Sequence, residues 1–175
     1  METAIVAVVC IALVMFGALT MLQTSLSSVD LVNEAWRERE QTTQEIAMTD
    51  ISSLSTNVTD AGAIVEMTLK NEGESKLKDF GRWDVIVQYR DTATTLLIKR
   101  LLYVEGEPGN DQWTVKGIYL DAATRNPEVF ESGILNPDEE MIIRMRLNPP
   151  VGVGTTNRAT IATPNGVSTS ATFTR

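Results

Sequence analysis

Residues Ala4 to Leu22 read AIVAVVCIALVMFGALTML, an almost wholly apolar run close to the N-terminus of the chain. No charged side chain occurs from Thr3 to Val29, and the rest of the sequence is polar enough to be soluble. The run is about long enough to cross the hydrocarbon of a bilayer, which takes roughly 20 residues as a helix. An apolar N-terminal helix before a polar remainder has two uses: it anchors a domain to a membrane, or it packs against copies of itself in a polymer.

The helical pattern continues beyond the apolar run. Apolar residues recur at helical spacing at Leu22, Leu26, Val29, Leu31, Val32 and Trp36. Neither proline nor glycine interrupts the chain between Ala18 and Glu45, so we predict one helix from about Thr3 to about Gln44. The run does not match a removable secretory signal, because no basic residue precedes it and no clear cleavage site follows it.

The two uses of this helix stay open on the residues alone. A membrane anchor with its N-terminus in the cytoplasm should carry Lys or Arg there, and Met1-Glu2-Thr3 carries neither. In a polymer, small residues let helix backbones approach closely. The apolar run supplies such residues at Ala4, Ala7, Ala12, Gly17 and Ala18. The flank therefore favours the polymer over the simple anchor.

After Thr42 the hydrophobic period changes from that of a helix to the alternation typical of half-buried strands. Strands are predicted at residues 46–58, 65–70, 83–90, 94–104, 112–120, 141–147, 159–163 and 167–173. Pro164-Asn165-Gly166 separates the last two, and Asn-Gly favours a hairpin because both turn positions tolerate φ > 0. Many short strands without a convincing second helix indicate an antiparallel immunoglobulin-like β-sandwich. We therefore predict an α+β chain, with a long hydrophobic polymerisation helix at residues 1–45 and a β-sandwich head at residues 46–175.

Composition argues against an enzyme and against a nucleic-acid partner. The 175 residues carry a net charge of −8, so no basic field exists to hold a polyanion. The chain has no histidine, which removes the commonest general base and metal ligand, and it has no P-loop or Gly-x-Gly-x-x-Gly motif. The single cysteine, Cys10, lies in the apolar run and is interpreted as a small hydrophobe. We expect no catalytic residue, no cofactor and no small-molecule substrate.

A few polar and aromatic residues are weaker candidates. The acids Glu105, Glu107 and Asp111 surround a turn, but their spacing matches no EF-hand loop, and we expect no metal there. Residues 138–140 are interpreted as a charged strand entrance. Asn57 opens an Asn-Val-Thr sequon and is the candidate N-glycosylation site. The tryptophans at Trp36, Trp83 and Trp113 are expected in the core or in subunit contacts, with packing inside the chain preferred for Trp36.

Four segments after the helix carry a resemblance to a known family. They are VEMTLKNEG at Val65–Gly73, WDVIVQY at Trp83–Tyr89, GILNPDE at Gly133–Glu139 and ATPNGV at Ala162–Val167. With the order of helix and sandwich, they resemble the archaellins, the subunits of the archaeal-type swimming filament within the type IV pilin-like superfamily. Bacterial type IV pilins usually carry Glu at the fifth mature position, where this chain has Ile5, so the archaellins are the better match.

The resemblance implies a structural subunit of an extracellular archaellum-like filament for swimming, in which apolar helices bundle into a rod. The helix–helix contacts are predicted at eight residues, called the seam residues: Ile5, Val6, Val9, Leu13, Phe16, Leu19, Leu22 and Leu26. The implied partners are identical subunits, the membrane before assembly, and the motor and platform proteins at the filament base. Two alternatives stay open: an adhesive type IV pilin-like filament subunit, and a membrane-anchored envelope-binding accessory protein of the archaellum.

Overall fold

The computed structural model describes residues 2–128 and 130–175, without the side chains of Glu2, Ala4 and residues 22–31. The chain divides into two compact units, one ending at Gln44 and the other formed by Glu45–Arg175. The second unit is called the head.

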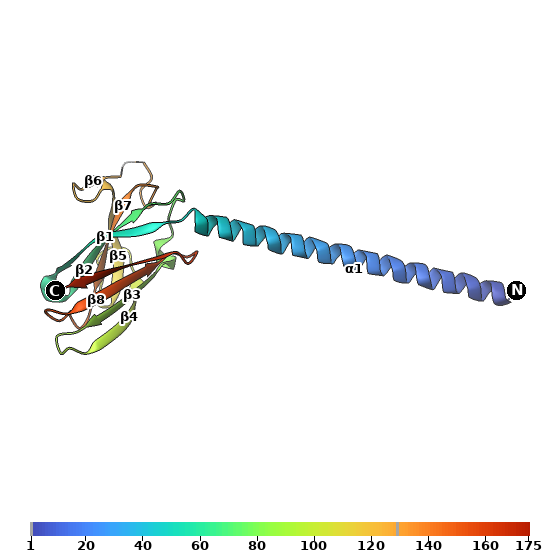
Figure 1. The fold of residues 1–175 in the computed structure, drawn as a ribbon, viewed down its shortest axis with the longest axis horizontal. Coiled ribbons are helices and arrows are strands. Elements are labelled where there is room, and N and C mark those ends of the chain that lie inside the picture. Colours follow the sequence, from blue (N-terminus) through green and yellow to red (C-terminus); the bar gives the residue numbers. More distant parts are fainter. Residues whose placement is uncertain (1, 129) are drawn as a thin grey trace. The chain divides into compact units, whose positions relative to one another are not determined.

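A single α-helix, α1, covers Glu2–Ala47 (Figure 1). Among the described residues, no helix combines enough length and hydropathy to cross a membrane. The end of α1 is closed by Thr49, whose hydroxyl donates to the carbonyl oxygen of Glu45 at 2.7 Å and whose N–H donates to that of Ile46 at 3.2 Å. The strand predicted from Ile46 therefore begins later, at Ile51, because the local hydrogen bonds extend the helix through the start of the predicted strand.

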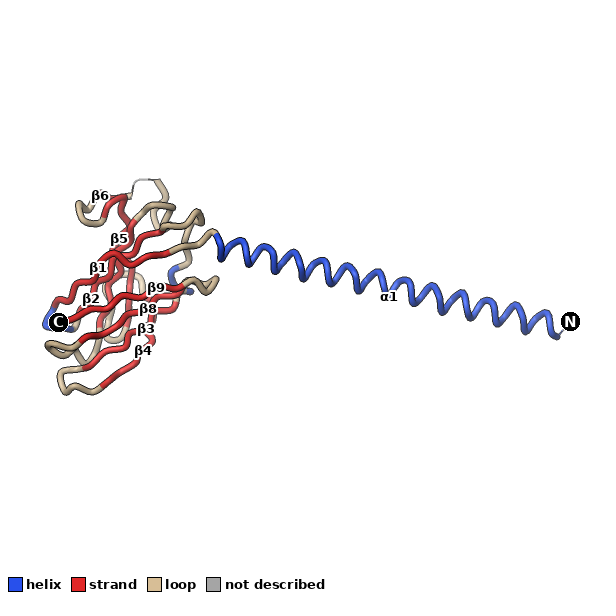
Figure 2. The backbone as a smooth tube through the Cα atoms, in the orientation of Figure 1, coloured by secondary structure: helices blue, strands red, loops and turns tan. Residues whose placement is uncertain are grey.

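The head contains short strands and two turns of 3₁₀-helix (Figure 2). The strands are β1 Ile51–Thr59, β2 Ile64–Asn71, β3 Asp84–Arg90, β4 Leu96–Tyr103, β5 Gln112–Asp121, β6 Asn126–Pro127, β7 Glu140–Arg146, β8 Thr156–Ala162 and β9 Ser168–Thr174. The 3₁₀-helices are η1 Asp60–Gly62 and η2 Phe80–Arg82. The two-residue strand β6 was not predicted, because two residues are too few to show a periodic pattern.

The described strands form one sheet in the order β1-β2-β7-β5-β4-β3-β8-β9, with β6 beside β5. Neighbours are antiparallel except β4 and β5, which pair in parallel through Leu102 with Gln112 and Tyr103 with Trp113. The outermost strands also meet, since the Thr56 hydroxyl of β1 donates to the Thr172 carbonyl oxygen of β9 at 3.3 Å. The predicted α+β class with a large antiparallel sheet is confirmed. The predicted antiparallel immunoglobulin-like sandwich is corrected in one respect, because the parallel β4–β5 pair links the strands into one sheet that nearly closes as a barrel.

Alternating residues of the central strands fill the core, as their sequence pattern predicts. In β2, β3 and β7 the fully buried side chains are Val65, Met67, Leu69, Val85, Val87, Tyr89, Met141, Ile143 and Met145, each 0% exposed. Two apolar residues stand where the alternation calls for polar ones, and both lie on the outer faces: Ile86 is 41% exposed and Ile142 is half-buried. Burial raises the pKa of Tyr89 to about 12, and its hydroxyl donates to the carbonyl oxygen of Pro149 at 3.0 Å.

Two turns of the head, at residues 71–75 and 164–166, hold the segment that follows α1. The backbone N–H groups of Glu74 and Ser75 donate to the Met48 carbonyl oxygen at 2.8 and 3.0 Å, and the Asn165 amide donates to the Thr49 hydroxyl at 2.8 Å. In the second turn Gly166 alone adopts positive φ, at 90°. The predicted hairpin is confirmed, since β8 and β9 pair antiparallel on either side of this turn.

Candidate interaction surfaces

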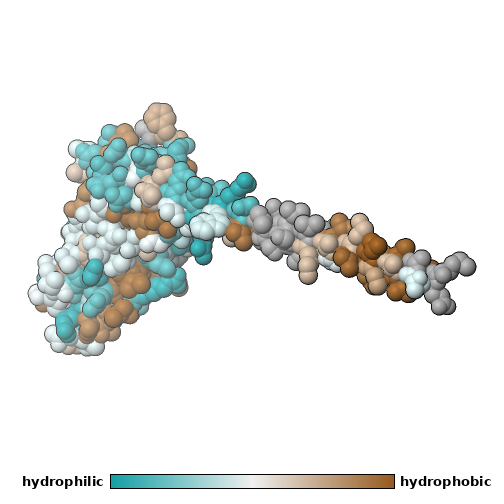
Figure 3. Space-filling model, turned by 45° about the vertical axis from the view of Figure 1, so that its right-hand side comes forward, coloured by the Kyte–Doolittle hydropathy of each residue, from teal (hydrophilic) through white to brown (hydrophobic). Residues whose placement is uncertain are grey.

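The first candidate surface is the apolar part of α1, which Figure 3 shows as a brown stretch of the helix. Of the seam residues, Ile5, Val6, Val9, Leu13, Phe16 and Leu19 are between 51% and 69% exposed. The side chains of Leu22 and Leu26 lie outside the described residues. A second set of apolar side chains, which the seam prediction did not include, is equally open: Val8, Ile11, Val14, Met15 and Met21 are between 61% and 77% exposed.

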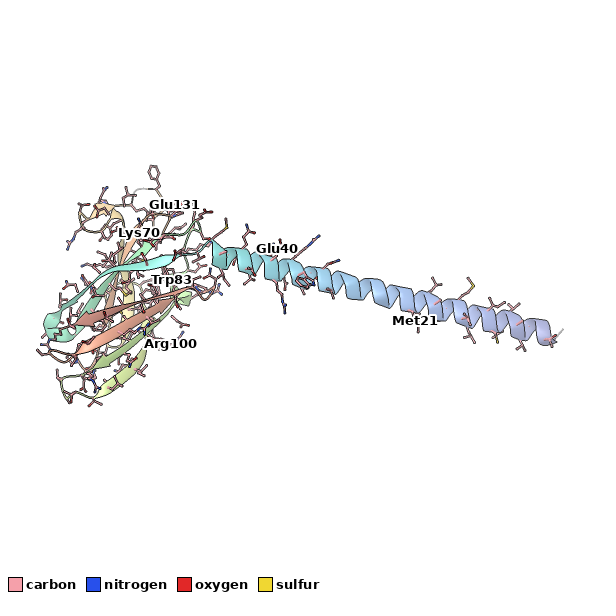
Figure 4. All side chains as sticks on the ribbon, viewed as in Figure 1. Met21, Glu40, Lys70, Trp83, Arg100 and Glu131 are labelled. Carbon is pink, nitrogen blue, oxygen red and sulfur yellow. The ribbon has the colours of Figure 1, made fainter. Side chains whose placement is uncertain are left out.

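These two sets surround the helix instead of forming one stripe. Successive residues of an α-helix are turned by about 100° around its axis. Val14, Met15 and Phe16 are consecutive and all exposed. Met21, labelled in Figure 4, is a further exposed member of the same apolar part of α1. A helix that is apolar all round is stable in water only when other apolar groups cover it. The sequence period did not identify a single contact face because the apolar residues occupy every face.

The polar part of α1 differs from the expectation in one respect. Trp36 is 66% exposed, and it lies with Val32, Ala35 and Arg39 around a shallow hollow of the helix surface. Trp36 therefore does not pack within its own unit, and its contact partner stays a prediction. The other two tryptophans follow the prediction, since Trp83 is 3% and Trp113 0% exposed.

On the head, the outer face of β2, β5 and β7 is polar and paired within the chain. Lys116 donates to the Glu66 carboxylate at 2.8 Å and Arg144 does so at 3.0 Å. Arg144 also holds both carboxylate oxygens of Glu107, at 2.8 and 2.9 Å. Burial alone raises the pKa of Glu66, but the hydrogen bonds and charges of Lys116 and Arg144 together outweigh burial, so the pKa lies below its ordinary value.

Because the folded-state pKa of Glu66 is lowered, its ionised form stabilises the head above the ordinary pKa, and this stabilisation is lost as the pH falls through the folded-state pKa. We expect Glu66→Gln to lower the free energy of unfolding by about 1 kcal/mol at pH 7. The difference from wild type should shrink on acidification towards about pH 3, as measured by urea denaturation.

The matched control is Glu131→Gln, which removes an exposed ion pair with Lys76 at 2.6 Å and should change stability by less than about 0.5 kcal/mol. An equal loss for Glu66→Gln at both pH values would mean that shape, and not charge, causes its effect.

The outer face of β3 and β4 is the second candidate surface, and it is apolar where the β2–β5–β7 face is charged. We call it the β4 face, and its apolar members are Ile86 at 41%, Leu96 at 49%, Ile98 at 67% and Leu102 at 59% exposed. Arg100 of β4, labelled in Figure 4, lies among them and is paired with Asp84 of β3 at 2.5 Å. Scattered apolar residues are normal on a surface, but a row of them on neighbouring strands marks a contact site.

The polar candidates from the sequence are placed as follows. Glu107 is held by Arg144, and Asp111 is held by Lys99 at 2.6 Å, so two acids of the Glu105–Asp111 turn have cationic partners within the chain. Across the described parts of the chain, no cluster of three acids, cysteines or histidines has the arrangement of a metal site. Asn57 is exposed on β1, and its glycosylation stays a prediction.

The comparisons with known proteins give a fold likeness only. No family model matches the chain, and the comparison with curated proteins finds no match. The archaellum periplasmic stator protein FlaG from Sulfolobus acidocaldarius is 21% identical, with a TM-score of 0.52 over 71% of this chain and 99% of that chain. The stator complex of FlaF and FlaG from the same organism matches at 20% identity and a TM-score of 0.51, over 70% of this chain and 87% of that one.

A third solved structure, the archaeal flagellum of Methanospirillum hungatei strain JF1, is 15% identical. Its TM-score is 0.61, and the match covers 96% of this chain and 90% of that chain. All three structures are of archaellum components, from the periplasmic stator and from the filament. At these identities the likeness establishes a shared fold and leaves open which kind of component this chain is.

Proposed function

We propose that the protein is a structural component of an archaellum-like machine, retained at the cell envelope as an accessory protein of the stator type. The observation that carries the proposal is the match to FlaG, which accounts for 99% of that stator protein. The work of the protein is mechanical: α1 attaches it, and the head contacts other components. The absence of catalytic activity stays a prediction.

The apolar surface of α1 supplies the attachment. Burying an exposed side chain the size of Leu or Ile contributes about 1.5–3 kcal/mol, and the described side chains from Ile5 to Met21 include eleven large apolar ones that are at least 51% exposed. Their combined burial would strongly stabilise the attached state. This holds whether lipid or other apolar helices cover them, since the driving force depends on the apolar area removed from water.

A filament subunit, the main expectation from the sequence, remains the second candidate. The observation that favours it is the extent of the match to the Methanospirillum filament, which covers 96% of this chain and therefore includes α1. A helix that is apolar on every face also suits a rod, where neighbours surround each helix. The two candidates differ in what covers α1 and in how many copies a cell contains.

Fractionation of the native cells separates the two candidates. Appendages are sheared off and purified, and the protein is quantified in the appendages and in the envelope by mass spectrometry against labelled peptides. The accessory role predicts that detergent releases the protein from the envelope and that it is a minor constituent of the appendages. Sheared filaments made mainly of this chain would contradict the accessory role and establish the filament subunit.

A further inference from the structure

The strand β4 has one edge that is largely unpaired. At its start, the Asp91 N–H donates to the Thr95 carbonyl oxygen at 3.1 Å across the β3–β4 hairpin. At its end, the Leu102 N–H donates to the Asp111 carbonyl oxygen at 3.3 Å, on the side away from β3. Backbone groups alternate sides along a strand, so the odd-numbered residues of β4 face β3 and the even-numbered residues face the other edge.

On that other edge, the pairing with β5 comprises only Leu102 and Tyr103. The N–H and C=O groups of Leu96, Ile98 and Arg100 therefore point to an edge where no strand of the described residues pairs with them. Such an edge is a ready template for another strand. The exposed apolar side chains of the β4 face lie along the same residues, so the edge offers hydrogen bonds and apolar contacts together.

We propose that a second copy of this chain docks here, with the two β4 strands paired antiparallel about a two-fold axis through Ile98. In this register Ile98 faces the second copy's Ile98, and Leu96 faces the second copy's Arg100. It is the register in which all three unpaired residues of each strand find a partner. Every hydrogen-bonded pair of an antiparallel ladder exchanges two bonds, so the three pairs satisfy the open groups of both edges.

Charge also selects this register. Shifting the second strand by two residues in one direction places Lys99 opposite Lys99, and shifting it by four in the same direction places Arg100 opposite Arg100. Like charges directly opposite are destabilising. In the proposed register Lys99 faces Leu97. Both cations of β4 are moreover neutralised within their own chain, Lys99 by Asp111 at 2.6 Å and Arg100 by Asp84 at 2.5 Å, so little net charge enters the contact.

The proposal is independent of whether the protein is an accessory component or a filament subunit. Three residue pairs cover less area than the roughly 800 Å² per partner of a standard interface. We therefore expect weak pairing in dilute solution and strong pairing where α1 gathers copies, because a high local concentration drives the second contact.

Disulfide trapping tests the register. In the full chain carrying Cys10→Ser, Ile98→Cys should place two cysteines about 5.5 Å apart between Cα atoms, inside the roughly 4.4–6.8 Å range that a disulfide needs. Ile98 is 67% exposed, so the substitution leaves the core intact. The protein is purified in detergent, oxidised mildly and run on non-reducing gels, and we expect most of the Ile98→Cys chain to form dimers.

The matched control is Leu96→Cys in the same background, on the same exposed face. In the proposed register the two copies of residue 96 lie about 14 Å apart, four residues along the strand, so at least a tenfold smaller dimer fraction is expected. Mixing Leu96→Cys chains with Arg100→Cys chains should restore the dimer through a mixed disulfide. Equal trapping at all three positions, no trapping at Ile98, or dominant trapping of Arg100→Cys with itself would overturn the proposal.

Discussion

Replacing Trp113 by alanine is expected to lower the free energy of unfolding of the head by about 3–5 kcal/mol. Trp113 is 0% exposed and packs edge-on against Tyr103, with ring centroids 5.0 Å apart. The same two residues form a backbone pair in the short parallel ladder between β4 and β5. The substitution therefore opens a cavity at the parallel β4–β5 ladder, which joins two groups of antiparallel strands.

Urea denaturation followed by circular dichroism measures this loss, with Trp36→Ala as the matched control. Trp36 is 66% exposed on α1, so its removal should change the stability of the head by less than about 0.5 kcal/mol. A loss for Trp113→Ala no larger than that of the control would show that the β4–β5 join does not depend on this aromatic pair.

Leu13→Arg is expected to reduce attachment of the protein to the envelope or the filament by about 100-fold while the head stays folded. Leu13 is 66% exposed, so the charge costs little in the isolated chain. The cost arises on assembly, because placing arginine among apolar helices or lipid is unfavourable by about 2.5–3.5 kcal/mol or more, and each 1.4 kcal/mol is about tenfold.

The measurement compares the bound and free protein in cells that express the variant, with far-UV circular dichroism of the purified chain as the check on folding. Thr43→Arg is the control, since Thr43 is also exposed, on the polar part of α1, and its replacement should leave attachment unchanged. If Leu13→Arg were retained as well as Thr43→Arg, the apolar surface of α1 would not be the attachment site.

Where one face of a strand packs on the core, the sequence alone predicts the structure well. The alternation around Val65, Val85 and Met141 identified three central strands and the side chains that they bury, because a period of two residues places every second side chain inside. Ile86 and Ile142 break that alternation, and both lie on the outer faces of their strands.

Features that depend on which elements are neighbours could not be predicted in this way. Periodicity indicates which residues share a face of a strand. It does not indicate that β4 pairs in parallel with β5 through only Leu102 and Tyr103, and it does not show that the rest of the β4 edge is unpaired. For α1 the eight predicted seam residues are a subset of a larger apolar surface. No one-dimensional pattern selects a face when consecutive residues such as Val14, Met15 and Phe16 are all apolar.

The two candidate surfaces require different kinds of partner. The backbone of α1 is satisfied by its own helical hydrogen bonds, so any apolar surroundings suffice to cover it. The β4 face combines apolar side chains with open backbone groups at Leu96, Ile98 and Arg100, so it requires an extended strand with matching groups. We infer that α1 provides attachment with little selectivity, whereas the head provides the specific contacts.

Labelling of Cys10 in native cells tests the central claim, the burial of the apolar surface of α1 in the assembled state, most directly. Cys10 is the only cysteine of the chain and is exposed on α1, so the denatured protein should react fully with a membrane-impermeant maleimide. In intact cells we expect Cys10 to stay unlabelled until detergent or denaturant is added, while a cysteine at Thr43 in the Cys10→Ser chain labels at once. Rapid and complete labelling of Cys10 in intact cells would contradict the account.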